Sequence, residues 1–230
     1  MTRAPIAVPL DTQDVETAAR WATAVGPHVA VLKIGLELFL RHGPEVVDVV
    51  RGGEKVGLFL DLKLHDIPKT VAGAAQSVAR LRPEYVTVHA GGGTAMVRAA
   101  VEAAPDVKIA AVTVLTSLSD ADLETIGVPG PPLDVVRRLG RLAVEAGARA
   151  LVCSPLEVAA LRAEVGADID LIVPGIRPLG SAADDQSRIA TPERALADGA
   201  SLLVIGRPIT GAADPGAAAA LLAEALVPVG

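Results

Sequence analysis

Residues 56–90 read VGLFLDLKLHDIPKTVAGAAQSVARLRPEYVTVHA, and this stretch decides the fold. It opens with an apolar run that ends at Leu62, continues with helical spacing from Pro68 to Leu81, and closes with a β-branched run that ends at Ala90. Continuous apolar strands separated by a helix are typical of a parallel sheet whose outer face is covered. The stretch therefore predicts a strand-helix-strand unit.

The same alternation extends over the whole chain. Eight strand-like runs recur: IAVPL (6–10), VAVLKI (29–34), VGLFLDL (56–62), YVTVHA (85–90), KIAAVTVL (108–115), ARALVC (148–153), DLIV (170–173) and SLLVI (201–205). Helical spacing lies between them over Asp14 to Val25, Pro68 to Leu81, Thr94 to Ala104, Leu133 to Ala146 and Pro192 to Asp198. Eight such units favour closure into a barrel over an open sheet. We expect an α/β protein, a (β/α)8 TIM barrel that forms one domain over residues 1–230.

Two expected connections are longer than a tight turn. One runs from Thr116 to Pro132 after the fifth strand, and the other from Gly175 to Thr191 after the seventh. Long loops at the carboxyl ends of barrel strands are where ligand lids lie. We therefore expect a ligand site at this end of the barrel.

Composition excludes several classes of protein. The net charge of −6 argues against a nucleic acid polymer as partner, because such binding needs a basic face. The one cysteine, Cys153, cannot form an internal disulfide, so we expect a small buried residue and a reducing compartment. No secretory segment and no apolar run long enough to span a membrane are found. We expect a soluble, cytoplasmic protein without a membrane partner.

Charged residues occur at the carboxyl ends of the first three strands. They are Asp11, Lys33, Asp61, Lys63 and Asp66. Side chains alternate along a strand and neighbouring parallel strands end at the same rim, so these charges should converge. They could be ion pairs that plug the barrel, and Asp66 could merely cap a helix. Burying several charges at one rim is costly, however, which favours a functional site.

Two later loops indicate a site for an anion. The sequence reads PGIRPLGSAADDQSR (174–188) after the seventh strand and IGRPIT (205–210) after the eighth, where barrels usually bind phosphate. Gly206 allows close backbone approach, Arg207 offers a bidentate guanidinium, and Arg177 and Gln186 can close from the loop. Against this, GRP is a short match and a lone arginine is usually just solvated. We interpret the glycines at 91–93 only as a permissive turn.

Motifs for metal, dinucleotide or serine-hydrolase chemistry are missing from the sequence. The four histidines, His28, His42, His65 and His89, are scattered without the spacing of a zinc helix, and neither a P-loop nor a dinucleotide fingerprint occurs. No Gly-x-Ser-x-Gly elbow supports a Ser-His-Asp triad. We interpret His89 as a residue that satisfies a polar position at the rim, and we expect no metal and no cofactor.

The segment DLKLHDIPKT (61–70) resembles the signature of orotidine 5′-phosphate decarboxylases, Asp-x-Lys-x-x-Asp-Ile-Pro-x-Thr, at every signature position. Further matches span nearly the whole chain: LKIGLELF, VTVHAGGG, AVTVLTS, VCSP, PGIRP, DDQSRI, TPERAL and VIGRPIT. The resemblance is to the bacterial type, in the ribulose-phosphate-binding barrel superfamily. Pro9 departs from it, because the family usually has a small residue there, and this could alter how the first strand presents Asp11.

The resemblance implies conversion of orotidine 5′-phosphate to UMP and CO2, the last step of de novo pyrimidine nucleotide synthesis, without metal or organic cofactor. Lys63 would protonate C6 within a charge network of Asp61, Lys33 and Asp66. The implied substrate-binding residues are Asp11, Lys33, Asp66 and Thr70 at the ribose, Thr116 at the pyrimidine, and Arg177, Gln186, Gly206 and Arg207 at the phosphate. The family is homodimeric, with Asp66 and Thr70 entering the neighbouring subunit's site.

Two alternatives stay open at this point. A metal-dependent phosphosugar decarboxylase or aldolase of the same superfamily shares a similar Asp-x-Lys-x-x-Asp strand, although the DIPxT extension and the GIRP loop argue against it. Activity that survives EDTA would separate the two. A non-catalytic nucleotide-binding barrel is disfavoured by the intact Lys63 and its carboxylate neighbours, and tight binding of a UMP analogue without turnover would favour it.

Overall fold

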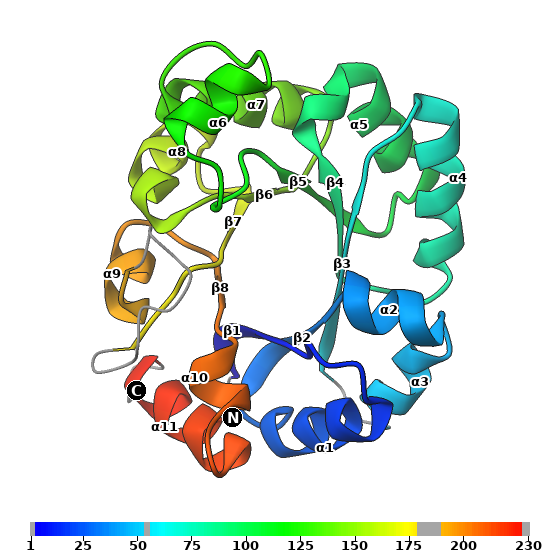
Figure 1. Ribbon diagram of the computed structural model, residues 1–230, viewed down its shortest axis with the longest axis vertical. Helices are drawn as coiled ribbons and strands as arrows, with labels where there is room; N and C mark the ends of the chain where they lie inside the picture. The colour runs from blue at the N-terminus through cyan, green and yellow to red at the C-terminus, as the bar shows by residue number, and fades with distance from the viewer. Residues whose placement is uncertain (1–2, 53–55, 179–189, 227–230) are drawn as a thin grey trace.

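A computed structural model gives the structure of the chain, and it describes residues 3–52, 56–178 and 190–226. Within these residues, eight parallel strands pair in sequence order and close into a barrel (Figure 1). They are β1 Ala4–Pro9, β2 Val29–Gly35, β3 Gly57–Leu64, β4 Tyr85–His89, β5 Lys108–Val112, β6 Ala150–Val152, β7 Asp170–Val173 and β8 Leu202–Val204. Each predicted run overlaps one of them, and the predicted fold class is confirmed.

A ring of helices covers the outside of the barrel (Figure 1). The five predicted helical segments correspond to α1 Val15–Val25, α4 Pro68–Ala79, α5 Gly93–Ala103, α7 Pro132–Glu145 and α9 Pro192–Ala197. Buried alanine and valine side chains line the inner faces of these helices, as at Ala18, Ala22 and Val25 of α1. Small side chains let helix and strand backbones lie close together, which suits a chain with 2% aromatic residues.

Other helices were not predicted. They are α2 Leu36–His42, α3 Val46–Arg51, α6 Asp120–Thr125, α8 Val158–Val165, α10 Arg207–Thr210 and α11 Pro215–Leu226, with 3-10 turns η1 Ala90–Gly92 and η2 Pro155–Glu157. Most span two turns or fewer, too short for a helical period to show in the sequence. In α11 the run of alanines and leucines has no polar face to mark a period. The glycines at 91–93 form η1 and open α5, as the turn interpretation expects.

The inside of the barrel is filled by one side chain from each strand. This cluster consists of Ala7, Val31, Phe59, Tyr85, Ala110, Ala150, Ile172 and Leu202. Small and large residues are combined, and the rings of Phe59 and Tyr85 pack edge to face with centroids 5.8 Å apart. Because inward positions recur every two residues, the next inward layer toward the carboxyl ends includes Lys33 and Asp61. The alternation that buries these core residues therefore also turns Lys33 and Asp61 inward, at the barrel mouth.

A polar cluster closes the opposite end of the barrel, at the amino ends of β4, β5 and β7. The Tyr85 hydroxyl donates to Asp170 Oδ2 at 2.8 Å, and Lys108 Nζ lies 2.7 Å from the same oxygen. The Lys108 ammonium also lies 5.2 Å from the centre of the Tyr85 ring. Burial, followed by the bond and the charge of Asp170, raises the pKa of Tyr85 well above its ordinary value. This end of the barrel is therefore built for stability.

We predict that the folded protein gives no tyrosinate absorbance at about pH 11, where a free tyrosine is mostly ionised. Tyr85 is the only tyrosine in the chain, so an alkaline absorbance titration reports on it alone. Above about pH 10 the unfolded chain loses this proton while the folded chain keeps it, so the free energy of unfolding should fall by about 1.4 kcal/mol per pH unit.

The control is Tyr85→Phe, whose urea-unfolding free energy should fall less steeply over the same alkaline range because no phenol ionises on unfolding. A tyrosinate signal with its midpoint near the ordinary pKa in the folded protein would contradict the prediction.

Candidate active site

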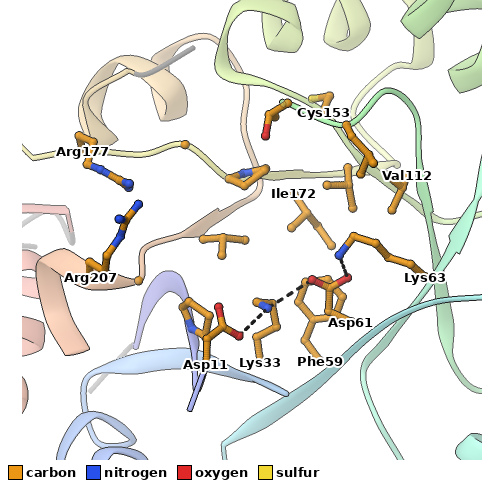
Figure 2. Close-up of a pocket in the computed structure, with 18 of the residues that line it drawn as sticks. Asp11, Lys33, Phe59, Asp61, Lys63, Val112, Cys153, Ile172, Arg177 and Arg207 are labelled. Atoms are coloured by element: carbon orange, nitrogen blue, oxygen red, sulfur yellow. Dashed lines mark hydrogen bonds and ion pairs between the residues drawn. The ribbon is translucent and has the colours of Figure 1, made fainter. Parts of the chain in front are cut away.

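Four charged side chains lie in a row of alternating sign across the mouth of the barrel (Figure 2). We call this row of Asp11, Lys33, Asp61 and Lys63 the charge chain. Lys33 Nζ lies 3.3 Å from Asp11 Oδ1 and 3.3 Å from Asp61 Oδ2. The other carboxylate oxygen of Asp61 lies 2.8 Å from Lys63 Nζ. The order along the mouth is therefore Asp11, Lys33, Asp61, Lys63, with negative and positive charges alternating.

The two middle side chains of the charge chain are more buried than the two at its ends. The Lys33 side chain is 9% exposed and that of Asp61 is 14% exposed, whereas Lys63 is 31% and Asp11 57% exposed. Burial by itself raises the pKa of Asp61, but the charges of Lys33 and Lys63, with hydrogen bonds from Lys63 and Thr87, outweigh it. The pKa of Asp61 is therefore held below its ordinary value, and the carboxylate stays charged beside the two ammonium groups.

The backbone at Gly35 leaves room for the charged side chains of Lys33 and Asp11. A methyl group at Gly35 would lie 3.2 Å from Lys33 Nζ and 3.1 Å from Asp11 Oδ1, so a side chain here would press on the ion pair. Pro9 is the register partner of Lys33, and Asp11 still reaches Lys33 beyond it. Gly35 was not singled out from the sequence, since a single glycine at a strand end carries no specific signal.

Lys63 has an unusual backbone conformation. Its φ is 48°, in the left-handed region that costs a residue with a side chain about 1–2 kcal/mol. The β3 to β4 register shifts at the same place, between Leu60 and Leu64. Strain of this kind persists only where surrounding contacts enforce it, and it is concentrated at functional positions. Contacts with neighbouring residues therefore hold Lys63, the last residue of the charge chain, in this backbone conformation.

The charge chain borders a cavity of about 500 Å³. Its apolar wall lies beside Asp61 and Lys63 and includes Phe59, Val112 and Ile172 (Figure 2). The other lining residues that sequence reasoning missed are Pro9, Val114, Leu115, Val152, Cys153, Pro174, Gly175, Val204 and Thr210. They are ordinary apolar or small residues, which no motif marks. The predicted residue Thr116 also lines the cavity.

Cys153 is buried, as expected from the sequence, and it belongs to the cavity wall. Burial, followed by the nearby Glu157 carboxylate, raises the pKa of its thiol well above the ordinary value. The sulfur therefore stays protonated and serves as an apolar part of the wall.

Two arginines occupy the side of the cavity away from Lys63, and their guanidinium groups point toward one another (Figure 2). Arg177 is buried, with Nη1 donating to Ile176 O at 3.0 Å, and its Nε has no hydrogen-bond partner among the described residues. Gly206 lines the cavity between them and Pro9, and a methyl group there would lie 3.0 Å from Pro9 Cγ. Like charges that face each other in a cavity create a site for an anion. Gln186, predicted for the same site, lies outside the described residues.

Asp66 and Thr70 do not reach the cavity within one chain. Both are exposed, and the Asp66 carboxylate accepts a hydrogen bond from the Ile67 backbone at 2.6 Å. Between them, the Ile67 side chain is 66% exposed. The described part of one chain thus brings together Asp11, Lys33, Asp61 and Lys63, but not the last two residues of the predicted set.

His89 lies at the rim, half-buried, with its ring 5.3 Å from that of His65. Burial, then the charges of His65 and Lys63, lowers the pKa of His89. Among the described residues, no three His, Cys, Asp or Glu side chains are grouped so that they could hold a metal ion. None of the helices in the described ranges is both long and apolar enough to cross a membrane.

Comparisons with known proteins agree with this geometry. Residues 4–222 match the family described as orotidine 5′-phosphate decarboxylase / HUMPS. An orotidine 5′-phosphate decarboxylase of Thermobifida fusca is 69% identical over 227 residues, which cover 99% of this chain and 97% of the relative. One of Frankia casuarinae is 59% identical over 245 residues, covering 99% of this chain and 89% of the relative.

Solved structures show the same fold. The crystal structure of orotidine 5′-phosphate decarboxylase from Lactobacillus acidophilus is 34% identical, with a TM-score of 0.86 over 98% of this chain and 100% of that one. An uncharacterised conserved protein from Geobacillus kaustophilus is 32% identical, with a TM-score of 0.84 over 97% of this chain and 100% of that one.

We predict that inorganic phosphate binds between Arg177 and Arg207 and stabilises the protein. At about ten times its Kd, phosphate should raise the free energy of unfolding by about 1.4 kcal/mol, or Tm by about 3–6 °C. Arg177→Met should abolish the shift, whereas Arg98→Met, on the exposed face of α5, should keep it. The measurement is thermal unfolding in phosphate against chloride of equal ionic strength. An equal shift in Arg177→Met would refute this assignment.

Proposed function

Because the chain belongs to the orotidine 5′-phosphate decarboxylase / HUMPS family, we propose that Lys63 protonates the pyrimidine during decarboxylation of orotidine 5′-phosphate. The reaction yields UMP and CO2, the last step of de novo pyrimidine nucleotide synthesis, and the enzyme is a carboxy-lyase. The observation that carries the assignment of Lys63 is its ammonium, 2.8 Å from buried Asp61 and beside an apolar cavity wall. No other ammonium of the charge chain is both exposed to the cavity and free of a second carboxylate.

The step breaks the bond between C6 and the carboxylate carbon. CO2 leaves, the electron pair remains on C6, and the Lys63 ammonium supplies the proton that makes the C6–H bond of UMP. A cation beside the developing carbanion is most effective where water is excluded, and the wall of Phe59, Val112 and Ile172 on this side of the cavity is apolar. Solvent then returns a proton to the neutral Lys63 amine after the product leaves.

Repulsion between Asp61 and the substrate carboxylate is too weak to drive the reaction alone. Like charges about 4 Å apart repel by about 4 kcal/mol at an intermediate effective dielectric. Enzymes generally lower barriers by about 8–23 kcal/mol. Most of the effect therefore comes from stabilisation of the carbanion by Lys63 and from binding energy at the parts of the substrate that do not react.

The substrate lies across the cavity in a single orientation. Its phosphate is held by Arg177, Gly206 and Arg207, and Gln186, which lies outside the described residues, is a further proposed phosphate ligand. The ribose hydroxyls bind Asp11 and Lys33, and Thr116 lies by the pyrimidine. This orientation follows from the distribution of charge, since the arginines lie away from Lys63 and the exposed carboxylate of Asp11 lies on the side of Lys33 nearer the arginines (Figure 2).

The test is the loss of orotidine 5′-phosphate absorbance on adding purified protein in the presence of EDTA. We expect rapid decay with the wild-type chain and a fall in kcat of at least about 1,000-fold with Lys63→Ala, because the proton donor and the cation at C6 are lost together. Circular dichroism of both proteins is the control for folding. No decay by a folded wild-type protein would indicate a metal-dependent phosphosugar relative instead.

We also propose that the chain forms a homodimer in which Asp66 and Thr70 complete the partner's site. Support comes from their exposure on one chain and from the exposed apolar side chains near the same rim. Ile67 is 66% exposed, Leu40 76% and Leu36 43%. Contact with a second copy would cover these side chains and would bring Asp66 toward the Lys63 end of the charge chain.

Mixing two inactive variants tests this arrangement. After dissociation and reassociation, Lys63→Ala and Asp66→Asn should regain roughly a quarter of wild-type activity, because half of the dimers are mixed and one of their two sites is intact. Lys63→Ala mixed with Asp11→Ala is the matched control and should regain none, because both residues belong to the same chain's site. Equal recovery in the two mixtures, or none in the first, would contradict the crossing of Asp66.

The cytoplasmic location and the single domain over residues 1–230 are further parts of the proposal. A nucleotide-synthesising activity supports the first, and the family match over residues 4–222 supports the second. Cell fractionation, and limited proteolysis that finds no separately stable fragment, are the respective measurements.

A further inference from the structure

Thr87 is a buried polar residue for which neither the sequence nor the reaction has yet supplied a role. It lies in the middle of β4, two residues after Tyr85, and faces the inside of the barrel with 0% exposure. It does not line the cavity. A buried hydroxyl must find partners, and the partners of Thr87 both belong to the charge chain.

The Thr87 hydroxyl both accepts and donates a hydrogen bond. Thr87 Oγ1 accepts a hydrogen bond from the Lys63 backbone N–H at 2.8 Å, and it donates to Asp61 Oδ1 at 3.1 Å. The same Asp61 oxygen receives the Lys63 ammonium at 2.8 Å. One side chain thus fixes the backbone of Lys63 and also the carboxylate that its ammonium contacts.

The sheet explains why a side chain is needed here. Leu60 pairs with Val86 and Leu64 with Val88, so three residues of β3 lie opposite Thr87 alone. Such a bulge leaves residues outside the regular ladder of backbone hydrogen bonds. The Lys63 N–H takes the Thr87 hydroxyl as its partner, at the residue whose φ is 48°.

We propose that Thr87 is a positioning residue, whose hydroxyl holds Lys63 in its left-handed conformation and directs the Lys63 ammonium toward the reacting carbon. The proposal rests on the function proposed for Lys63 and adds a residue that never touches the substrate. The valine isostere removes both hydrogen bonds while keeping the volume, so Lys63 can relax toward an ordinary strand conformation and its ammonium moves.

The experiment compares Thr87→Val, Thr87→Ser and Thr113→Val in steady-state decarboxylation of orotidine 5′-phosphate. Thr113 is the matched control, because it is also buried in the barrel and its hydroxyl donates to Val152 O at 2.9 Å, away from the charge chain. We expect Thr87→Val to lose about 10- to 100-fold in kcat, since a misplacement of about 1 Å can cost this much, with KM changed less than about threefold. Thr87→Ser and Thr113→Val should stay within about threefold of wild-type kcat.

Retention of wild-type kcat by Thr87→Val would overturn the proposal, and so would an equal loss in Thr113→Val, which would indicate general packing. If Thr87→Val does not fold, Thr87→Ala takes its place with the same expectations. A crystal structure of the Thr87 variant tests the positioning role separately from the decarboxylase function. Even if the wild-type chain does not decarboxylate the substrate, an unchanged Lys63 φ and Lys63 to Asp61 contact in the variant would overturn the positioning role.

Discussion

The site depends on one buried ammonium held between two carboxylates. Lys33 lies between Asp11 and Asp61, and taking such charges out of water costs several kcal/mol for each ion unless partners are placed well. Lys33 and Asp61 belong to β2 and β3 and Asp11 follows the end of β1, so the parallel register of these three strands decides whether the charges meet. The close approach at Gly35 completes this arrangement, because a side chain there would press on Lys33 Nζ.

The two ends of the barrel use charge for different purposes. At the amino ends of the strands, Tyr85, Lys108 and Asp170 satisfy one another and close the interior. At the carboxyl ends, the chain of charges stops at Lys63, which meets one carboxylate and opens onto a cavity with apolar walls. An ammonium in that position is available to a ligand, which fits the rule that barrel function lies at the carboxyl face and stability at the other.

The sequence predicted the barrel because its strands are continuous apolar runs, and it predicted the charge chain because strand alternation places Lys33 and Asp61 on the inner face. Short helices such as α2 and α6 were missed, since one or two turns carry no measurable period. The apolar wall of the cavity was missed because valine or isoleucine near a strand end looks like any other core residue. The proposed contact of Asp66 with a partner subunit rests on the resemblance, because no pattern within one chain indicates a contact between subunits.

The backbone conformation of Lys63 is the feature of the site that the sequence predicts least. Regular alternation would place its Cα about 6–7 Å beyond Asp61 on the same face, pointing across the barrel. The bulge in β3 instead turns the backbone at Lys63, where the Lys63 N–H donates to a hydroxyl from β4. A threonine in a strand is ordinary by propensity, and its special value here appears only when the opposite strand carries extra residues. The conformation of Lys63 is therefore specified by a pair of strands, not by its own motif alone.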